Sequence, residues 1–237
     1  MSLLRHAMVG LAVVLALGAQ PARSVASGLT AAEHDDPDVP AYSIDVSDDG
    51  LALTVTGGIR FGLAQDIRSA LEGWPKVRVI ILNSPGGRLG AAEDVARLIE
   101  ERGLDTFVEN DCESACTRVF VAGKNRRLFE KATLGFHGAA LTDHIIGEGL
   151  VRWIANQATV AQYVNDGVDR AFMERAVSVA PASMWFPTHD QLFAAHVITA
   201  VVRSDGQLIE PPDIVAHLGA GMPAPPPAPP APPAPPR

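Results

Sequence analysis

A serine, a histidine and a pair of glycines stand out in this chain because together they could perform acyl transfer. The serine lies in DCESACT (111–117), the histidine in GFHG (135–138) and the glycines in LNSPGG (82–87). A serine hydroxyl becomes a useful nucleophile when an imidazole accepts its proton, and backbone N–H groups must then stabilise the oxyanion. Taken singly, the serine could be a helix N-cap, the histidine structural and the glycines an ordinary turn.

The elements between these motifs decide whether the motifs meet. A nearly continuous β-branched run, VRVIIL, is typical of a strand buried on both faces, and alternation or helical spacing indicates the other elements. Strands are predicted over 51–56, 77–82, 106–109, 133–136 and 197–203, and helices over 63–71, 89–102, 114–122 and, with a break near Gly167, 148–180.

Alternating strands and helices predict a single α/β domain with largely parallel strands and right-handed crossovers. Chemistry in such folds lies just beyond the carboxyl ends of the strands. We therefore expect the residues that follow Leu82, Glu109 and Phe136 to lie close together, and these are the three motifs.

The N-terminus has the pattern of a secretory signal peptide over residues 1–26. An apolar run (7–18) follows Arg5, and Ser24-Val25-Ala26 predicts cleavage after Ala26. Cleavage would lower the basic count from 19 to 17 against 27 acidic residues, giving a net charge of −10. We expect a periplasmic or secreted protein, with membrane contact only through an uncleaved signal peptide.

The remaining segments differ in composition. Residues 27–42 are acidic and contain two prolines, which predicts a disordered lead-in, and residues 43–215 suffice for one well-packed domain. Residues 216–237 form a proline-rich tail, predicted to be disordered and extended, because ten of the 19 prolines lie between Pro223 and Pro236.

Composition argues against several functions. The acid excess disfavours nucleic acid as a partner, and no phosphate- or dinucleotide-binding glycine signature occurs. No metal or other cofactor is expected, because four ligands at a recognised spacing are missing. The scattered histidines are interpreted as surface or capping residues, namely His144, His189, His196 and His217.

The order and spacing of the three motifs resemble the proteolytic subunit of the Clp protease and its ClpP/crotonase-fold relatives. The resemblance runs from about Gly57 to His137 and more weakly to Thr199, with Ser114 27 residues after Gly87 and His137 23 residues after Ser114. The strings CESACT and GFH are also similar to an uncharacterised secreted or periplasmic branch of that superfamily.

The resemblance implies a core of repeated β-β-α units wound as a spiral, and a serine peptidase site. Ser114 would be the nucleophile, His137 the general base, and the amides of Gly87 and Ala115 the oxyanion hole. An extended substrate peptide would contact Gly86, Arg88 and Leu89. It also implies a homo-oligomer, assembled through helices such as those over 148–180.

The third member of the expected triad departs from the family pattern. Met184 stands where the family has an aspartate, and Asp190 and Asp143 are the acids that could replace it. Asp190 could instead cap a helix. The lysine of the related lysine-serine peptidases has no evident counterpart, because the nearby lysines are only Lys124 and Lys131.

Cys112 and Cys116, the two cysteines of the chain, flank Ser114. In an oxidising compartment they could form a disulfide that locks the serine turn, provided that Cys112 precedes the helix. The alternative is two buried thiols.

Three functions follow from these patterns. The first is a ClpP-like serine peptidase, periplasmic or secreted, acting on peptides or unfolded protein. The second is a catalytically inactive protein of the same fold that binds peptides or partners. The third and weakest is a crotonase-type acyl-CoA enzyme, with Gly86 and Gly87 holding a thioester oxyanion.

Overall fold

The structure is a computed structural model that describes residues 23–24, 36–141 and 147–210 of the 237-residue chain. Nearly all of the predicted signal peptide and the proline-rich tail lie outside the described residues. Asp143, His144 and His217 lie outside them as well.

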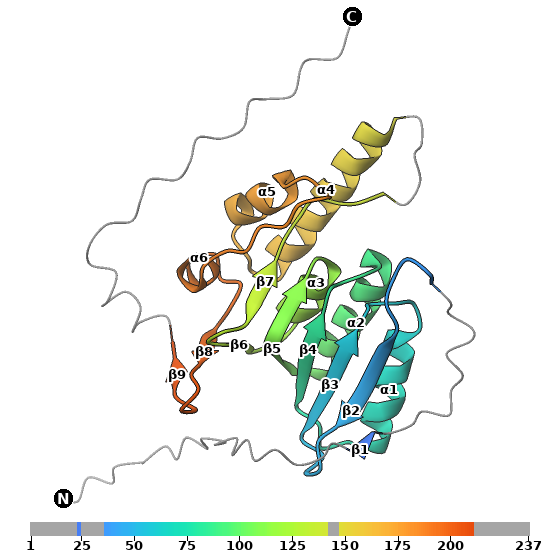
Figure 1. The fold of residues 1–237 in the computed structure, drawn as a ribbon, viewed down its shortest axis with the longest axis vertical. Helices are drawn as coiled ribbons and strands as arrows, with labels where there is room; N and C mark the ends of the chain where they lie inside the picture. Colours follow the sequence, from blue (N-terminus) through green and yellow to red (C-terminus); the bar gives the residue numbers. More distant parts are fainter. Residues whose placement is uncertain (1–22, 25–35, 142–146, 211–237) are drawn as a thin grey trace, which may run out of the picture.

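Parallel strands form the centre of one sheet, in the order β1-β2-β3-β4-β5-β6-β8-β9, with β7 also paired to β5 (Figure 1). Strands β3 to β6 and β8 run parallel, β7 is parallel to β5, and antiparallel strands lie at the two edges. The strands are β1 (Arg23–Ser24), β2 (Tyr42–Val46), β3 (Ala52–Gly57), β4 (Val79–Ser84), β5 (Asp105–Glu113), β6 (Arg126–Phe129), β7 (Thr133–Gly135), β8 (Ala200–Val202) and β9 (Leu208–Ile209).

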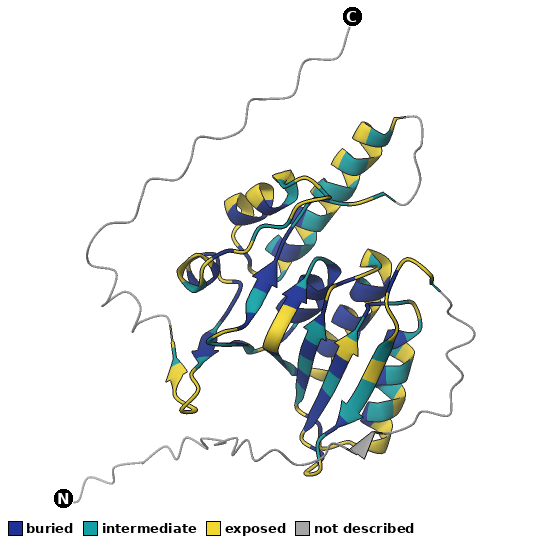
Figure 2. Cartoon of the chain, in the orientation of Figure 1, coloured by how far each residue is buried: buried dark blue, intermediate teal, exposed yellow. Residues whose placement is uncertain are grey.

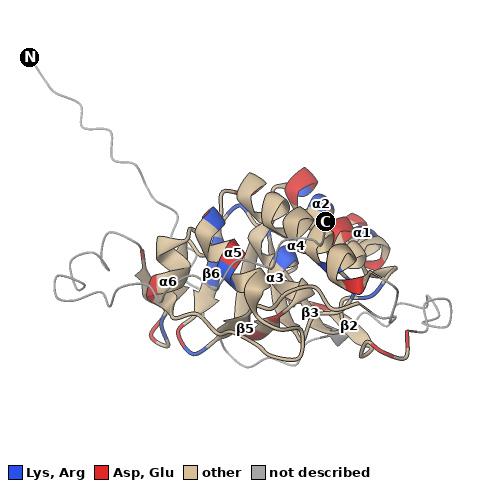
Figure 3. Cartoon of the chain, turned by 90° about the horizontal axis from the view of Figure 1, so that it is seen from above, with Lys and Arg blue, Asp and Glu red and all other residues tan. Residues whose placement is uncertain are grey.

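Six helices accompany the sheet in the described part of the chain. The helices α1 and α2 lie side by side against the sheet, and α4 packs on α5 at the other end of the molecule (Figures 1 and 3). Their bounds are α1 (Leu63–Gly73), α2 (Leu89–Arg102), α3 (Ala115–Val121), α4 (Glu148–Asn165), α5 (Arg170–Ser178) and α6 (His189–Ala194). The predicted α/β fold with largely parallel strands is confirmed.

Hydrophobic spacing explains why the core elements form where they do. The helix α2 has the predicted bounds, because its apolar stripe (Ala91, Val95, Leu98 and Ile99) is buried and Gly103 ends it with a φ of 60°. Dark blue core residues line both the strands and the inner faces of the helices (Figure 2). The core thereby holds the ends of β4, β5 and β7 in one place.

Strand β5 is longer than predicted, and this changes what surrounds the serine. The prediction ended at Glu109, whereas the strand continues to Glu113. Residues 106–108 pair with β6 and residues 111–113 with β7, so the exposed Asp111 still belongs to a ladder. Between them the β4–β5 register shifts, and Asn110 N–H donates to the side-chain oxygen of Asn83 instead. The apolar pattern ends there because these side chains are not in the core, although the backbone pairing continues.

Part of the predicted lead-in is ordered, so the prediction of a disordered segment over 27–42 is wrong for residues 36–42. The side chain of Val39 is 5% exposed, and Tyr42 begins β2. Carboxylates of Asp36 and Asp38 bind Arg88. The acidic residues here are therefore not merely solvated, because a buried valine and an arginine partner hold them against the domain.

Two observations bear on the predicted signal peptide and on membrane contact. No helix within the described ranges is long and apolar enough to span a membrane. The two residues of β1 pair with β2 inside the segment predicted to be a signal peptide, so cleavage after Ala26 would remove that pairing.

Candidate active site

Ser114 occupies a tight turn between β5 and α3. Its φ of 52° and ψ of −126° are unusual for a residue with a side chain, and such backbone conformations persist only where the surroundings hold them. The Ser114 N–H donates to Gly135 O at 2.8 Å, which continues the β5–β7 ladder into the turn. The turn therefore presents the Ser114 hydroxyl at the carboxyl end of the strand.

His137 lies two residues beyond β7 and reaches the same point. Its Nε2 is 2.7 Å from Ser114 Oγ, and its Nδ1 is 2.7 Å from the carbonyl oxygen of Gly138. A carbonyl oxygen can only accept, so the Nδ1 must carry the proton in this hydrogen bond. The neutral ring then has its lone pair on Nε2, and Ser114 donates to it, which is the arrangement that general-base catalysis needs.

Backbone hydrogen bonds to Trp185 and Val179 hold the residues on either side of His137. Phe136 exchanges two backbone hydrogen bonds with Trp185, both at 2.9 Å, and their rings cluster with that of Phe172. Gly138 N–H donates to Val179 O at 2.9 Å. A side chain could not replace the hydrogen of Gly138, because a Cβ there would lie 2.5 Å from Val177 O.

Among the residues that the structure describes, no carboxylate contacts the imidazole. Trp185 pairs antiparallel with Phe136, so Met184 lies beside His137. The Met184 side chain packs over Gly135. Asp190 is exposed in the first turn of α6, and both ring nitrogens of His137 have other partners. Asp190 is therefore not the third member, and it is not the helix cap either, because Thr188 caps α6 in a capping box with Gln191.

The glycine turn packs directly on the serine turn. Gly86 has a φ of 92°, and a Cβ on it would lie 2.8 Å from Ser114 Cβ and 3.0 Å from Ala115 N. Ile59 N–H donates to Gly86 O and Arg88 N–H donates to Ile59 O, each at 2.8 Å. Only a glycine allows this approach.

Two backbone amides at this contact are free to bind an anion. Ile59 binds Gly86 O and Arg88 N–H, the backbone groups on either side of Gly87. The N–H of Gly87 itself therefore points away from Ile59. Across the described residues, neither this N–H nor that of Ala115, at the start of α3, has an acceptor. The two amides predicted as an oxyanion hole therefore flank the place where Gly86 meets Ser114.

The predicted substrate contacts have different environments. Leu89 is 37% exposed and free to touch a ligand. The Arg88 side chain is instead occupied, since its Nε and Nη2 lie 2.6 and 2.7 Å from the two carboxylate oxygens of Asp36. The hydrogen bond from Arg88 holds the pKa of Asp36 below its ordinary value. The pair anchors the glycine turn, and Arg88 as a substrate contact stays a prediction.

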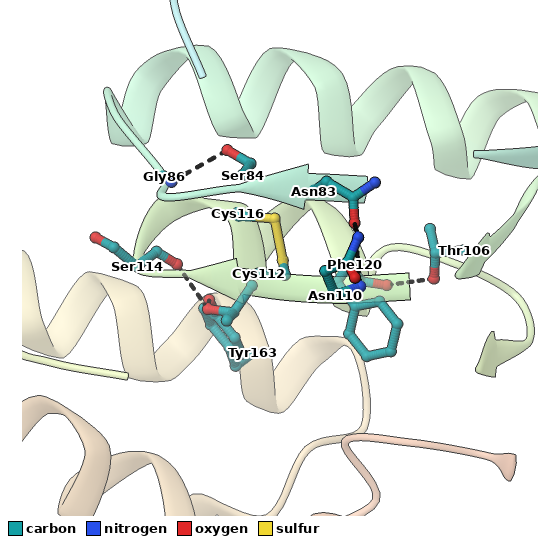
Figure 4. The surroundings of a disulfide bond; sticks show 11 residues. Asn83, Ser84, Gly86, Thr106, Asn110, Cys112, Ser114, Cys116, Phe120 and Tyr163 are labelled. Atoms are coloured by element: carbon teal, nitrogen blue, oxygen red, sulfur yellow. Dashed lines mark hydrogen bonds between the residues drawn. A yellow bond between two sulfur atoms is a disulfide. The ribbon is translucent and has the colours of Figure 1, made fainter. Parts of the chain in front are cut away.

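The two cysteines form a disulfide beside the serine (Figure 4). Cys112 lies in β5 and Cys116 in α3, so the first cysteine precedes the helix, as the bond requires. Both are fully buried. The disulfide closes the strand–helix turn over Ser114 and opposes its opening.

A buried hydroxyl chain supports the turn from inside. The Thr117 hydroxyl donates to Ser114 O at 2.7 Å, and Tyr163 OH lies 2.7 Å from the same threonine oxygen. Because the Thr117 hydroxyl donates its proton to the Ser114 carbonyl, the Tyr163 hydroxyl must donate to the Thr117 oxygen. Burial raises the pKa of Tyr163, which keeps its proton in place. Sequence patterns did not indicate this network, since both residues appear as ordinary core positions.

A buried arginine ties α3 to its neighbours. The acidic residues of α1 and α2 gather on one side of the molecule (Figure 3). From this side Glu93 and Glu100 bind Arg118, and Asp166 binds it from the end of α4, at 2.7 to 3.3 Å. The helix that follows Ser114 is thereby fixed from two directions.

Within the described ranges, no three side chains of the types that bind metals come together. Lys124 and Lys131 are exposed, and the Ser114 hydroxyl is bonded to His137 rather than to a lysine.

Sequence comparison does not assign this chain, since no protein-family model and no curated protein matches it. Solved structures do resemble it. ClpP1 of Listeria monocytogenes matches with a TM-score of 0.54 and 14% identity, over 66% of this chain and 93% of that one. A point mutant of the same protein matches with a TM-score of 0.54 and 15% identity, over 67% of this chain and 95% of that one. The predicted ClpP-like fold is therefore confirmed.

Proposed function

We propose that this ClpP-fold protein is a serine hydrolase that cleaves peptides or unfolded protein outside the cytoplasm. The observation that carries the proposal is the Ser114–His137 hydrogen bond of 2.7 Å, with the Nδ1 proton engaged by Gly138 O. This combination supplies a nucleophile and a base in the reactive tautomer, at the ends of adjacent strands.

The reaction would follow from these positions. His137 Nε2 takes the proton of Ser114 as Oγ forms a bond to the substrate carbonyl carbon, and the amides of Gly87 and Ala115 stabilise the oxyanion. The imidazolium then protonates the amine as the C–N bond breaks, which leaves the acyl group on Ser114 Oγ. Water next attacks the acyl carbon while His137 takes its proton, and His137 returns a proton to Oγ as the acyl–Oγ bond breaks. The Gly138 carbonyl would stabilise the imidazolium as a dipole rather than as a full charge, so we expect slower turnover than with a carboxylate.

Location outside the cytoplasm rests on the signal-peptide pattern and the Cys112–Cys116 disulfide. Disulfides persist in oxidising compartments and are rare in the cytosol. Fractionation of cells producing the full chain, with N-terminal sequencing of the product, tests both the compartment and cleavage after Ala26.

Self-association is proposed on the exposed half of α4. Leu150, Trp153 and Ile154 are 63%, 58% and 54% exposed and lie at helical spacing, which makes an apolar stripe of the kind that marks contact sites. Sedimentation of the full chain and of Trp153→Glu tests this, and equal monomeric masses would reject it.

Substrate class is tested with fluorescein-labelled unfolded casein. The full chain is expected to release labelled peptides, and Ser114→Ala is not. Binding of casein without release by a folded wild type would instead favour the peptide-binding alternative.

A further inference from the structure

The Gly138–Ala139 peptide group joins the histidine to helix α4. Its carbonyl oxygen accepts from His137 Nδ1 at 2.7 Å, and its N–H donates to Asn156 Oδ1 at 2.8 Å. The described residues contain no cis peptide bond, so the C=O and the N–H of this group point in opposite directions. Fixing the N–H end on Asn156 therefore aims the oxygen at the imidazole.

Asn156 is itself held in one orientation. Its Nδ2 donates to Val177 O at 3.2 Å, while its Oδ1 accepts from Ala139. These two partners require one donor and one acceptor on the same planar group, which an asparagine amide provides. The Gly138 N–H donates to Val179 O at the end of α5, which holds the preceding His137–Gly138 peptide group. Val179 therefore fixes the chain before Gly138, and Asn156 fixes the peptide group after it.

We propose that Asn156 is a positioning residue for catalysis, which acts through the Gly138–Ala139 peptide group to hold His137 in the Nδ1–H tautomer. The peptide group thus supplies the partner of Nδ1 that a carboxylate supplies in the expected triad, and Asn156 orients it. Asn156 contacts neither Ser114 nor the imidazole, so its effect passes entirely through this one peptide plane. The proposal rests on the proposed hydrolase function for its catalytic consequence, but the tautomer itself does not depend on turnover.

The tautomer is measured directly by ¹⁵N NMR of the full chain labelled with ¹⁵N-histidine. The His137 signals are assigned by their loss in His137→Ala, and spectra are taken well above the ordinary histidine pKa of about 6.5. Asn156→Leu keeps the number and branching of the side-chain heavy atoms but removes both polar atoms. Asn156→Asp keeps an acceptor for Ala139 N–H. Gln157→Ala removes a similar amide from an exposed neighbouring position of α4 and is the matched control.

The wild type, Asn156→Asp and Gln157→Ala are expected to show the Nδ1–H form, and Asn156→Leu is expected to lose its predominance. Reaction of Ser114 with a fluorophosphonate should slow about 10- to 100-fold in Asn156→Leu alone, the order of loss that misplaced groups cause. Should Asn156→Leu fail to fold, Asn156→Ala supplies the same comparison.

An unchanged tautomer with labelling within twofold of wild type in Asn156→Leu would overturn the positioning role. A folded wild type that shows the Nδ1–H form but never reacts would instead reject the hydrolase function, while the tautomer comparison still decides what Asn156 does.

Discussion

Gly86 lies so close to Ser114 that a Cβ on residue 86 would be 2.8 Å from the serine Cβ. The glycine turn after β4 and the serine turn after β5 therefore fit together as one unit. This contact places the Gly87 N–H beside the nucleophile, and it is the reason why a residue without a side chain is needed there.

Replacement of Gly86 is expected to impair both stability and reactivity. Gly86→Ala would meet Glu113 O at 2.6 Å and would require a φ of 92°, so we expect a loss of about 1 to 3 kcal/mol and slower fluorophosphonate labelling. Gly149→Ala is the control, because nothing lies within 4 Å of its added Cβ in helix α4. Thermal unfolding and labelling rates measure both effects, and a Gly86→Ala protein as stable and reactive as wild type would contradict this contact.

The disulfide is expected to stabilise the serine turn. Closing the five-residue loop from Cys112 to Cys116 corresponds to about 2 kcal/mol by chain entropy. Reduction of the wild type should then lower Tm by about 4 to 8 °C for a domain of this size. The double variant Cys112→Ala/Cys116→Ala should show no response to reductant. Alkylation of unreduced wild type, followed by mass spectrometry, should detect no free thiol.

The hydroxyl chain beneath Ser114 should behave as one coupled unit. Thr117→Val leaves the buried Tyr163 hydroxyl without its acceptor, which costs about 1 to 3 kcal/mol, while Tyr163→Phe removes only the outer donor and costs about 1 kcal/mol. Denaturant unfolding of both single variants and the double variant measures the coupling. Strict additivity would show that the two hydroxyls do not act together.

The Arg88–Asp36 ion pair should give the protein a stability difference that depends on pH. The folded-state pKa of Asp36 lies below its ordinary value, so the folded state binds the proton less readily than the unfolded state. The stabilisation is therefore complete above the ordinary pKa of about 3.8 and is lost as the pH falls through the lowered folded value. The Tm difference between wild type and Asp36→Asn should accordingly be largest near neutral pH and vanish in acid. A difference that grows as the pH falls would contradict the pairing.

Local patterns accounted for much of the fold. The stripe of α2 and the glycine after it predicted that helix to the residue. The apolar run over 77–82 predicted β4, which begins and ends two residues later, and its side chains alternate between buried and half-buried instead of being buried on both faces. Strand β6 was missed because two of its four residues are arginines, whose side chains bind Asp105 and backbone carbonyls rather than alternate with core positions. Strand pairing of this kind depends on neighbours distant in sequence.

Some residues of the site could likewise be predicted from the sequence, and others could not. Ser114, His137 and the glycine turn could be predicted because side-chain type and order carry their chemistry. The partner of His137 Nδ1 could not, since it is a backbone carbonyl that every residue possesses. The hold of Asp36 on Arg88 spans 52 positions and falls in a segment whose composition indicated only a solvated lead-in.

The most direct test of the account is covalent labelling of the full chain by a fluorophosphonate, with the modified residue located by mass spectrometry. Wild type is expected to carry one label, on Ser114. Ser114→Ala should carry none, and His137→Ala should react at least about 10³-fold more slowly because no base takes the serine proton. Labelling that persists in Ser114→Ala, or a folded wild type that never reacts, would contradict the assignment of Ser114 as an activated nucleophile.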